Sequence, residues 1–129
     1  MRLLYVIQRY GPDVAGGAEM HCRLFARQMA ERGHEVAVLT SCAVSHVSWA
    51  NVYAPGTETF EGVQVHRLAV AVPKNQHLVA ALNARVNGSP RTLSLDFQEH
   101  WMRQQGPYVP DLPAEIGRAS CRERVYVLV

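Results

Sequence analysis

The feature that most constrains what this chain can fold into is a glycine-bearing loop between two short apolar runs, followed by a helical pattern. The apolar runs cover residues 3–7 and 36–39, and such runs are typical of strands covered on both faces of a parallel sheet. Between them, residues 18–32 predict a helix that Gly33 ends. Its expected inner face consists of Ala18, Cys22, Phe25, Ala26 and Met29. The sequence therefore predicts a βαβ unit, and with it an α/β fold whose parallel sheet is flanked by helices.

A hairpin and two further helices are predicted after this unit. The turn residues Glu61 and Gly62 separate two strand patterns at residues 57–60 and 63–68, and residues 70–72 are expected to extend the second strand. Apolar residues then recur at helical spacing over residues 74–86 and again over residues 93–105. The sequence NGSP breaks the pattern between these helices, and Gly106-Pro107 ends the second one.

Length and composition indicate a globular chain. It has 129 residues, 48% hydrophobic and 19% charged, which suffices for one domain with a sizeable core or for part of a larger enzyme. The net charge of +2 is too small to predict nucleic acid as a partner. The apolar run near the N-terminus is too short for a secretory signal, and no run approaches the roughly 20 residues of a membrane span. Three cysteines without a C-x-x-C pair favour a reducing, cytoplasmic location.

The loop between the first strand and the first helix, residues 8–17, is called the glycine loop. Its glycines, Gly11, Gly16 and Gly17, do not have the G-x-G-x-x-G spacing of a dinucleotide site, which disfavours a Rossmann epimerase. A P-loop would need Lys and Ser or Thr where Gly17 and Ala18 stand. Two adjacent glycines at a helix start can still bring backbone N–H groups close to a phosphate. The simpler alternative, that they only permit a tight loop, stays open.

Several segments resemble one family of enzymes. RYGPDVAGGAE opens the first helix, and RQMAERGHEVAVLT follows it. Later in the chain come SWANVY at residues 48–53, GVQVHR at residues 62–67 and QQGPY at residues 104–108. Together they resemble the N-terminal domain of a family 4 glycosyltransferase of the GT-B fold. The resemblance covers residue 1 to about residue 112.

The resemblance implies two Rossmann-like domains with a cleft between them, of which residues 1–115 are the incomplete N-terminal, acceptor-side domain. Such an enzyme moves a sugar from a nucleotide-sugar donor to an acceptor hydroxyl with retention at the anomeric carbon. Gly16 and Gly17 would approach the donor phosphates. The family's E-x7-E carboxylates and basic phosphate clamp belong to the C-terminal domain. No histidine here matches the family's acceptor-side histidine, so the catalytic residues are unknown and this fragment is expected to be inactive alone.

An acceptor pocket can be predicted from aromatic and amide side chains, which suit a sugar or lipid-linked sugar. The candidates are Tyr10, Trp49, Asn51 and Tyr53. A packed loop with one buried aromatic is the alternative. No metal-ligand spacing is present, and neither a metal nor another cofactor is expected. The resemblance also allows the full-length enzyme peripheral contact with the inner face of the membrane.

A second class of function remains open. The chain could be a stand-alone α/β module that binds a phosphorylated small ligand without catalysis. The two interpretations differ in the chain expected after Pro110, because the enzyme needs a second βαβ-rich domain with paired glutamates and a binding module does not.

The last part of the chain has a different character. Residues 116–125, IGRASCRERV, carry no apolar period that continues the fold, and they resemble the translation of a common sequencing-library adapter. Residues 116–129 are therefore predicted to be a non-native tail, with the natural sequence diverging near Ala114 or Glu115. A genuine amphipathic end is the alternative.

Overall fold

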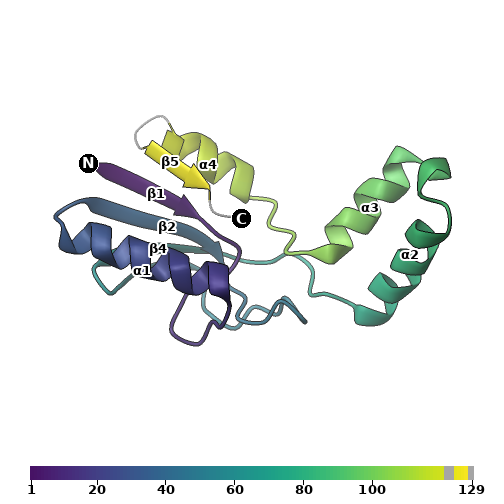
Figure 1. The fold of residues 1–129 in the computed structure, drawn as a ribbon, viewed down its shortest axis with the longest axis horizontal. Helices are drawn as coiled ribbons and strands as arrows, with labels where there is room; N and C mark the ends of the chain where they lie inside the picture. Colours follow the sequence, from purple (N-terminus) through teal and green to yellow (C-terminus); the bar gives the residue numbers. More distant parts are fainter. Residues whose placement is uncertain (121–123, 128–129) are drawn as a thin grey trace.

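An open β-sheet forms the centre of the molecule (Figure 1). The structure is a computed structural model that describes residues 1–120 and 124–127. Within those residues the sheet has five strands in the order β3-β4-β2-β1-β5. All neighbours pair in parallel except β3, which is antiparallel to β4. The strands are β1 (Arg2–Val6), β2 (Glu35–Ser41), β3 (Gly56–Phe60), β4 (Val63–Leu68) and β5 (Arg124–Val127).

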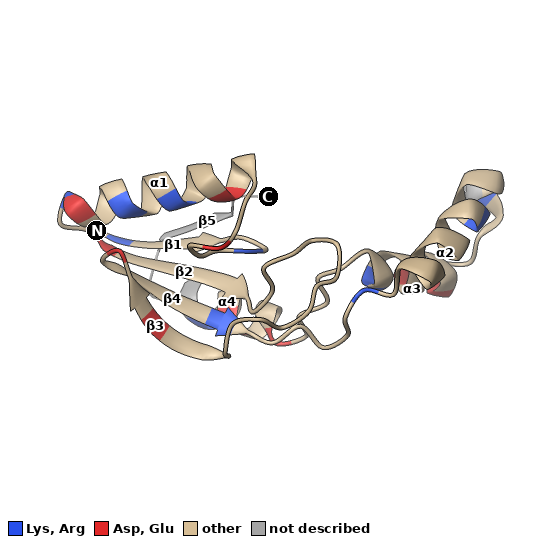
Figure 2. Cartoon of the chain, turned by 90° about the horizontal axis from the view of Figure 1, so that it is seen from below, with Lys and Arg blue, Asp and Glu red and all other residues tan. Residues whose placement is uncertain are grey.

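Helices cover both faces of this sheet. Helix α1 (Gly17–Glu31) lies on one face and α4 (Leu112–Ser120) on the other (Figure 2). Helices α2 (Gln76–Gly88) and α3 (Leu95–Gln105), joined through the short 3-10 helix η1 (Pro90–Thr92), form a hairpin that stands away from the sheet (Figure 1). The predicted α/β class is thus confirmed, with one antiparallel strand at the edge.

Two apolar clusters hold the helices onto the sheet, because alternate strand residues point to opposite faces. On the α1 side, Cys22 and Ala26 of the helix pack into a cluster with Leu3, Tyr5, Ile7, Tyr10, Val36, Val38, Val63 and Val65. On the other side, Leu112 and Ile116 of α4 pack against Leu4, Val6, Ala37 and Leu39. The continuous apolar runs in the sequence therefore correspond to strands covered on both faces.

Helix α1 confirms the predicted helix, with its ends one residue earlier than expected. Gly33 has φ 84° just past the helix, a backbone conformation that favours glycine. The predicted inner face is too wide, however. Ala18 is exposed and Phe25 is 39% exposed. The small side chains of Cys22 and Ala26 make a narrow contact with the sheet, and Phe25 lies beside it against His21.

The β3–β4 hairpin is confirmed, and its turn has the geometry that a tight hairpin needs. Glu61 and Gly62 both have positive φ, 52° and 77°. The predicted extension of the second strand over residues 70–72 is wrong, because β4 ends at Leu68. The carboxamide of Asn51 bonds both the N–H and the carbonyl of Val70, so this backbone pairs with a side chain instead of a neighbouring strand.

The helices of the projecting hairpin begin two residues later than predicted. Asn75 precedes α2 and accepts a hydrogen bond from the backbone N–H of Leu78. Ser94 precedes α3 and accepts one from Phe97. Both side chains act as N-caps, and a capping residue has non-helical backbone angles, so each helix starts after its cap.

The end of the chain contributes regular structure. Residues 112–120 form α4, and β5 pairs with β1 in parallel. The prediction that residues 116–125 do not continue the fold is therefore wrong for the described part, since Ile116 lies one helical turn after Leu112 and packs with it. Residues 121–123, with Cys121, lie outside the described residues. The adapter origin of the tail and the domain boundary at residue 115 stay predictions.

Candidate functional site

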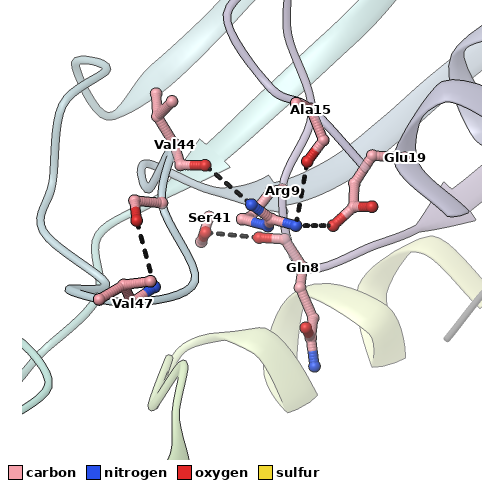
Figure 3. Close-up of polar contacts among 8 residues, drawn as sticks. Gln8, Arg9, Ala15, Glu19, Ser41, Val44 and Val47 are labelled. Atoms are coloured by element: carbon pink, nitrogen blue, oxygen red, sulfur yellow. Dashed lines mark hydrogen bonds and ion pairs between the residues drawn. The ribbon is translucent and has the colours of Figure 1, made fainter. Parts of the chain in front are cut away.

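The carboxyl ends of the parallel strands bring two loops together at one edge of the sheet. The glycine loop follows β1, and residues 42–55, the β2–β3 loop, follow β2. The Ser41 hydroxyl donates to the carbonyl of Gln8 and so joins the end of β2 to the start of the glycine loop (Figure 3). This edge is where open α/β sheets bind ligands.

Gly16 and Gly17 lie at the N-terminus of α1, as predicted, but they differ in their surroundings. Gly16 is the N-cap with φ 155°, and a Cβ there would lie 2.9 Å from the carboxyl carbon of Glu19. The positive φ favours glycine at position 16, and the Cβ contact is with the movable end of the Glu19 side chain. A Cβ on Gly17 would meet no atom within 4 Å, so the space above Gly17 is open. Within the described chain, no side chain caps this helix N-terminus.

The side chain of Arg9 lies beside these glycines (Figure 3). Its Nη1 donates to the carbonyl of Val44 at 3.0 Å, and its Nη2 donates to the carbonyl of Ala15 at 3.4 Å and to the carboxylate of Glu19. The Arg9 and Glu19 side chains are only 10% and 13% exposed. A largely buried ion pair thus lies at the start of α1, with the cation supplied by the glycine loop.

Three buried polar atoms lack a hydrogen-bond partner in the part of the chain that the structure describes. They are Arg9 Nε and Tyr10 Oη, in the glycine loop that follows β1, and Thr40 Oγ1, near the carboxyl end of β2. Buried polar atoms normally have a hydrogen-bond partner. The three described atoms without one all lie at this edge of the sheet, which distinguishes it from the rest of the core.

Tyr10, a candidate for the acceptor pocket, is inside the core. Its exposure is 0%, and its ring packs edge-on against Phe60. Burial raises the pKa of its hydroxyl well above the usual range, because the ionised form would lose its hydration. In this structure Tyr10 is not placed to contact a ligand.

Trp49, Asn51 and Tyr53 each tie the β2–β3 loop to a different segment. Trp49 Nε1 donates to the carbonyl of Gln105 at 2.9 Å. Asn51 is bonded to Val70 through its carboxamide. The polar groups of all three side chains are used in hydrogen bonds within the protein. These contacts agree with the alternative interpretation of residues 48–53, a packed loop.

Tyr53 is the one candidate of this motif that reaches the glycine loop. Its hydroxyl accepts from the N–H of Asp13 at 3.2 Å and donates to the Asp13 carboxylate at 2.9 Å. A Cβ at Gly11, which has φ 152°, would lie 2.6 Å from the same hydroxyl oxygen. Tyr53 therefore holds the first half of the glycine loop, and Gly11 leaves room for it.

Arg67 contacts both the glycine loop and the side chain of Tyr53. Its side chain is 2% exposed, its Nη1 donates to the carbonyl of Tyr10 at 2.6 Å, and its Nε and Nη2 both donate to Glu58. Its guanidinium carbon lies 4.0 Å from the centre of the Tyr53 ring, a cation–π contact. Arg67 joins β3, β4, the glycine loop and the β2–β3 loop.

Arg9, Glu19 and Arg67 were missed as site residues, although the sequence contains a signal for two of them. Arg67 falls on the same alternating face as Val63 and Val65, and Arg9 continues the alternation of Tyr5 and Ile7. A charged residue in register with an apolar strand face points into the protein and needs a partner there.

The same part of the chain offers no cluster of metal ligands. Residues 1–120 and 124–127 contain no group of three His, Cys, Asp or Glu side chains placed to hold a metal ion. None of the described helices has the length and apolarity needed to cross a bilayer. Cys22 and Cys42 are buried free thiols, and burial raises the pKa of Cys22 to about 12.

No protein-family model, curated protein or solved structure matches this chain. A proposal of function therefore rests on the geometry of the glycine loop and on the sequence motifs around it.

Proposed function

We propose that this chain is the Rossmann-like, acceptor-side half of a retaining family 4 glycosyltransferase of the GT-B fold. The full enzyme transfers a sugar from a nucleotide-sugar to an acceptor hydroxyl. The observation that carries the proposal is the open N-terminus of α1 at the carboxyl edge of the parallel sheet, with Gly17 free of steric neighbours. The motif resemblance adds the reaction class.

The chemistry of this site follows from its backbone. When the sugar leaves, the diphosphate gains negative charge, and donors fixed in advance stabilise that charge in the transition state. The N-terminus of α1 offers backbone N–H groups and the positive end of the helix dipole. Gly17 lets a phosphate approach these groups without a side chain in the way. No catalytic residue is assigned, and this binding mode requires no metal.

The acceptor side of the proposal does not include a pocket of aromatic side chains. Tyr10 is buried, and the polar groups of Trp49, Asn51 and Tyr53 bond to other segments of the chain. A sugar or lipid-linked sugar remains the proposed acceptor, with the full-length enzyme in the cytoplasm and in peripheral contact with the membrane.

The experiment that tests the proposal starts from the gene. The source DNA is read through and beyond the Ala114 codon, the full frame is expressed, and release of nucleoside diphosphate is measured over a panel of nucleotide-sugars. The expected result is a second α/β domain with an E-x7-E pair and sugar transfer. A frame that encodes the printed tail and then stops, together with ligand binding without turnover, would favour the stand-alone phosphate-binding module instead.

A variant of the full-length enzyme then tests the site. Gly17→Val adds a side chain to open space, so the protein is expected to fold normally while the KM for the donor rises at least about tenfold. Gly88→Val is the matched control, because a Cβ at Gly88 also meets no atom within 4 Å and this residue ends α2, away from the sheet. Equal donor KM values for the two variants would mean that Gly17 only permits a tight loop.

A further inference from the structure

A carboxylate lies next to the place where the ligand's phosphate is proposed to bind. The Glu19 side chain folds back over Gly16, and its carboxyl carbon would lie 2.9 Å from a Cβ at that residue. Glu19 is also the third residue of α1, so its carboxylate is at the positive end of the helix dipole. An anion of the protein's own therefore lies at the start of the helix.

The cation beside it, Arg9, also has hydrogen-bond acceptors other than Glu19. Arg9 donates to the carbonyl of Val44 in the β2–β3 loop and to that of Ala15 in the glycine loop (Figure 3). Its Nη2 lies 3.3 Å from the position of a Cβ at Gly16, so the guanidinium is next to the helix N-terminus. The bond to the Val44 carbonyl, at 3.0 Å, does not involve Glu19 and can persist when the Glu19 carboxylate leaves.

Arg9 also has a hydrogen-bond donor to spare. Its side chain is nine-tenths buried, and its Nε–H has no acceptor among the described residues. The Glu19 carboxylate, in contrast, has Arg9 as its one hydrogen-bond partner within the described chain. Glu19 therefore has fewer hydrogen-bond partners than Arg9. A ligand with several oxygens could accept from more of the Arg9 N–H groups than Glu19 does.

We infer that Glu19 is an internal substitute for the ligand's phosphate, and that a diphosphate binds by displacing the Glu19 carboxylate from Arg9. The Arg9 guanidinium then pairs with a phosphate oxygen, the backbone N–H groups at Gly17 bind another, and Glu19 turns outward to solvent. The identity of the ligand, the diphosphate of a nucleotide-sugar, rests on the proposed function. The exchange of Glu19 for an anion rests on the contacts of Arg9 and Gly16.

The central test compares two variants of the 129-residue chain that lose the same charge from the same helix. Glu19→Gln removes the competing anion, so it is expected to bind inorganic pyrophosphate about tenfold tighter than the unmodified chain. Glu31→Gln is the control, because Glu31 is exposed at the far end of α1 in a surface pair with Arg27. Its affinity is expected to change less than about twofold. Isothermal titration calorimetry measures the pyrophosphate affinity of the unmodified chain and of both variants.

A second measurement needs no variant and so does not depend on Glu19→Gln folding. In the unmodified chain, pyrophosphate is expected to shift the NMR signals of the Arg9 Nε–H and of the Gly16 and Gly17 amides. The Arg23 Nε–H, which donates to Glu61 at 2.9 Å, is the internal control and should not move. Unchanged Arg9 and glycine signals at saturating pyrophosphate, or equal affinities for the two glutamine variants, would overturn the inference.

The affinities of the Glu19→Gln variant for inorganic phosphate, pyrophosphate and uridine diphosphate distinguish the two possible kinds of ligand. Preference for the two diphosphates supports the nucleotide-sugar donor, whereas equal affinity for phosphate supports a phosphorylated small ligand. Either result is consistent with displacement of the Glu19 carboxylate from Arg9 by an anion. If instead the gene continues into an active glycosyltransferase but Glu19→Gln binds no better than Glu31→Gln, the proposed function stands and this inference fails.

Discussion

Arg9 and Arg67 lie at the same edge of the sheet, are both buried and each donate three side-chain hydrogen bonds, but from different nitrogen atoms. Arg67 donates from Nε, Nη1 and Nη2, to Glu58 and Tyr10. Arg9 donates from both Nη atoms but has an Nε without an acceptor among the described residues. Arg67 is therefore bonded at each of its three nitrogens, whereas Arg9 keeps one nitrogen, Nε, that a ligand could bond.

The partners of the two arginines differ in the same way. Glu58 is more than half exposed, so Arg67 is the buried member of a pair whose carboxylate is hydrated. Glu19 is 13% exposed and bends over a glycine at a helix N-terminus. The contrast is consistent with a structural role for Arg67 and with the inferred ligand-binding role of Arg9, and substitutions at and around the two arginines test both roles.

The largest effect is expected for Arg67→Met. The substitution leaves the Tyr10 carbonyl without its donor and removes the link between four segments, so the free energy of unfolding should fall by about 3 kcal/mol. Urea denaturation measures the change. Arg103→Met is the control, because Arg103 is half exposed in a surface pair, and it should cost less than about 0.5 kcal/mol. A similar small cost for both variants would contradict the structural role of Arg67.

Arg9→Met should destabilise less and impair binding more. The expected loss of unfolding free energy is about 2 kcal/mol, because Glu19 can turn toward solvent once its partner is gone. Pyrophosphate binding, measured by calorimetry where each variant is folded, should be lost in Arg9→Met and retained in Arg67→Met. Equal binding by the two variants would remove the distinction between the two arginines.

Tyr53→Phe tests the contact that holds the glycine loop from the Arg67 side. Loss of the hydroxyl removes two hydrogen bonds to Asp13, so we expect about 1 kcal/mol less stability and faster amide hydrogen exchange at Asp13. Tyr108→Phe is the control, since Tyr108 lies near α3, away from this loop. Unchanged exchange at Asp13 would show that the loop does not depend on Tyr53.

The smallest effect is expected for a third arginine–glutamate pair, Arg23 and Glu61, whose side chains are about a quarter exposed. The hydrogen bond from Arg23 lowers the pKa of Glu61 below its ordinary value of 4.5. Because the folded-state pKa is the lower one, the stabilisation is present above pH 4.5 and is lost as the pH falls through the folded-state value. Glu61→Gln should cost about 0.5 kcal/mol at pH 7 and almost nothing in strong acid.

Urea denaturation of both proteins at neutral and acid pH measures this difference. Glu35→Gln, in a pair that is more than half exposed, provides the comparison and should show little change at either pH. A Glu61→Gln effect that grew as the pH fell would contradict the direction of the pKa shift.

The local parts of the fold could be predicted because neighbours in sequence decide them. The turn at Glu61 and Gly62, the glycine after α1 and the apolar runs of β1 and β2 each depend on a few adjacent residues. The errors have a similar cause. Helices α2 and α3 start late because Asn75 and Ser94 act as caps, and a capping residue resembles a helical one when only apolar spacing is read.

The site was predictable only in part. Topology alone places Gly16 and Gly17 at the ligand-binding edge of the sheet. The bonds of the SWANVY motif join residues far apart in the chain: Trp49 contacts a residue 56 positions away and Tyr53 one 40 positions away. The sequence shows that such side chains are present, but not which carbonyl or carboxylate each will meet.

The α/β class, the first βαβ unit and the position of the glycine loop can all be obtained from the sequence, because apolar periodicity and glycine placement act over short distances. The surroundings of that loop depend on the folded arrangement. The pairing of Arg9 with Glu19, the open space above Gly17 and the burial of Tyr10 are all consequences of how β1, β2 and α1 pack. Burial and charge pairing are set by distances between segments, and those distances exist only once the chain has folded.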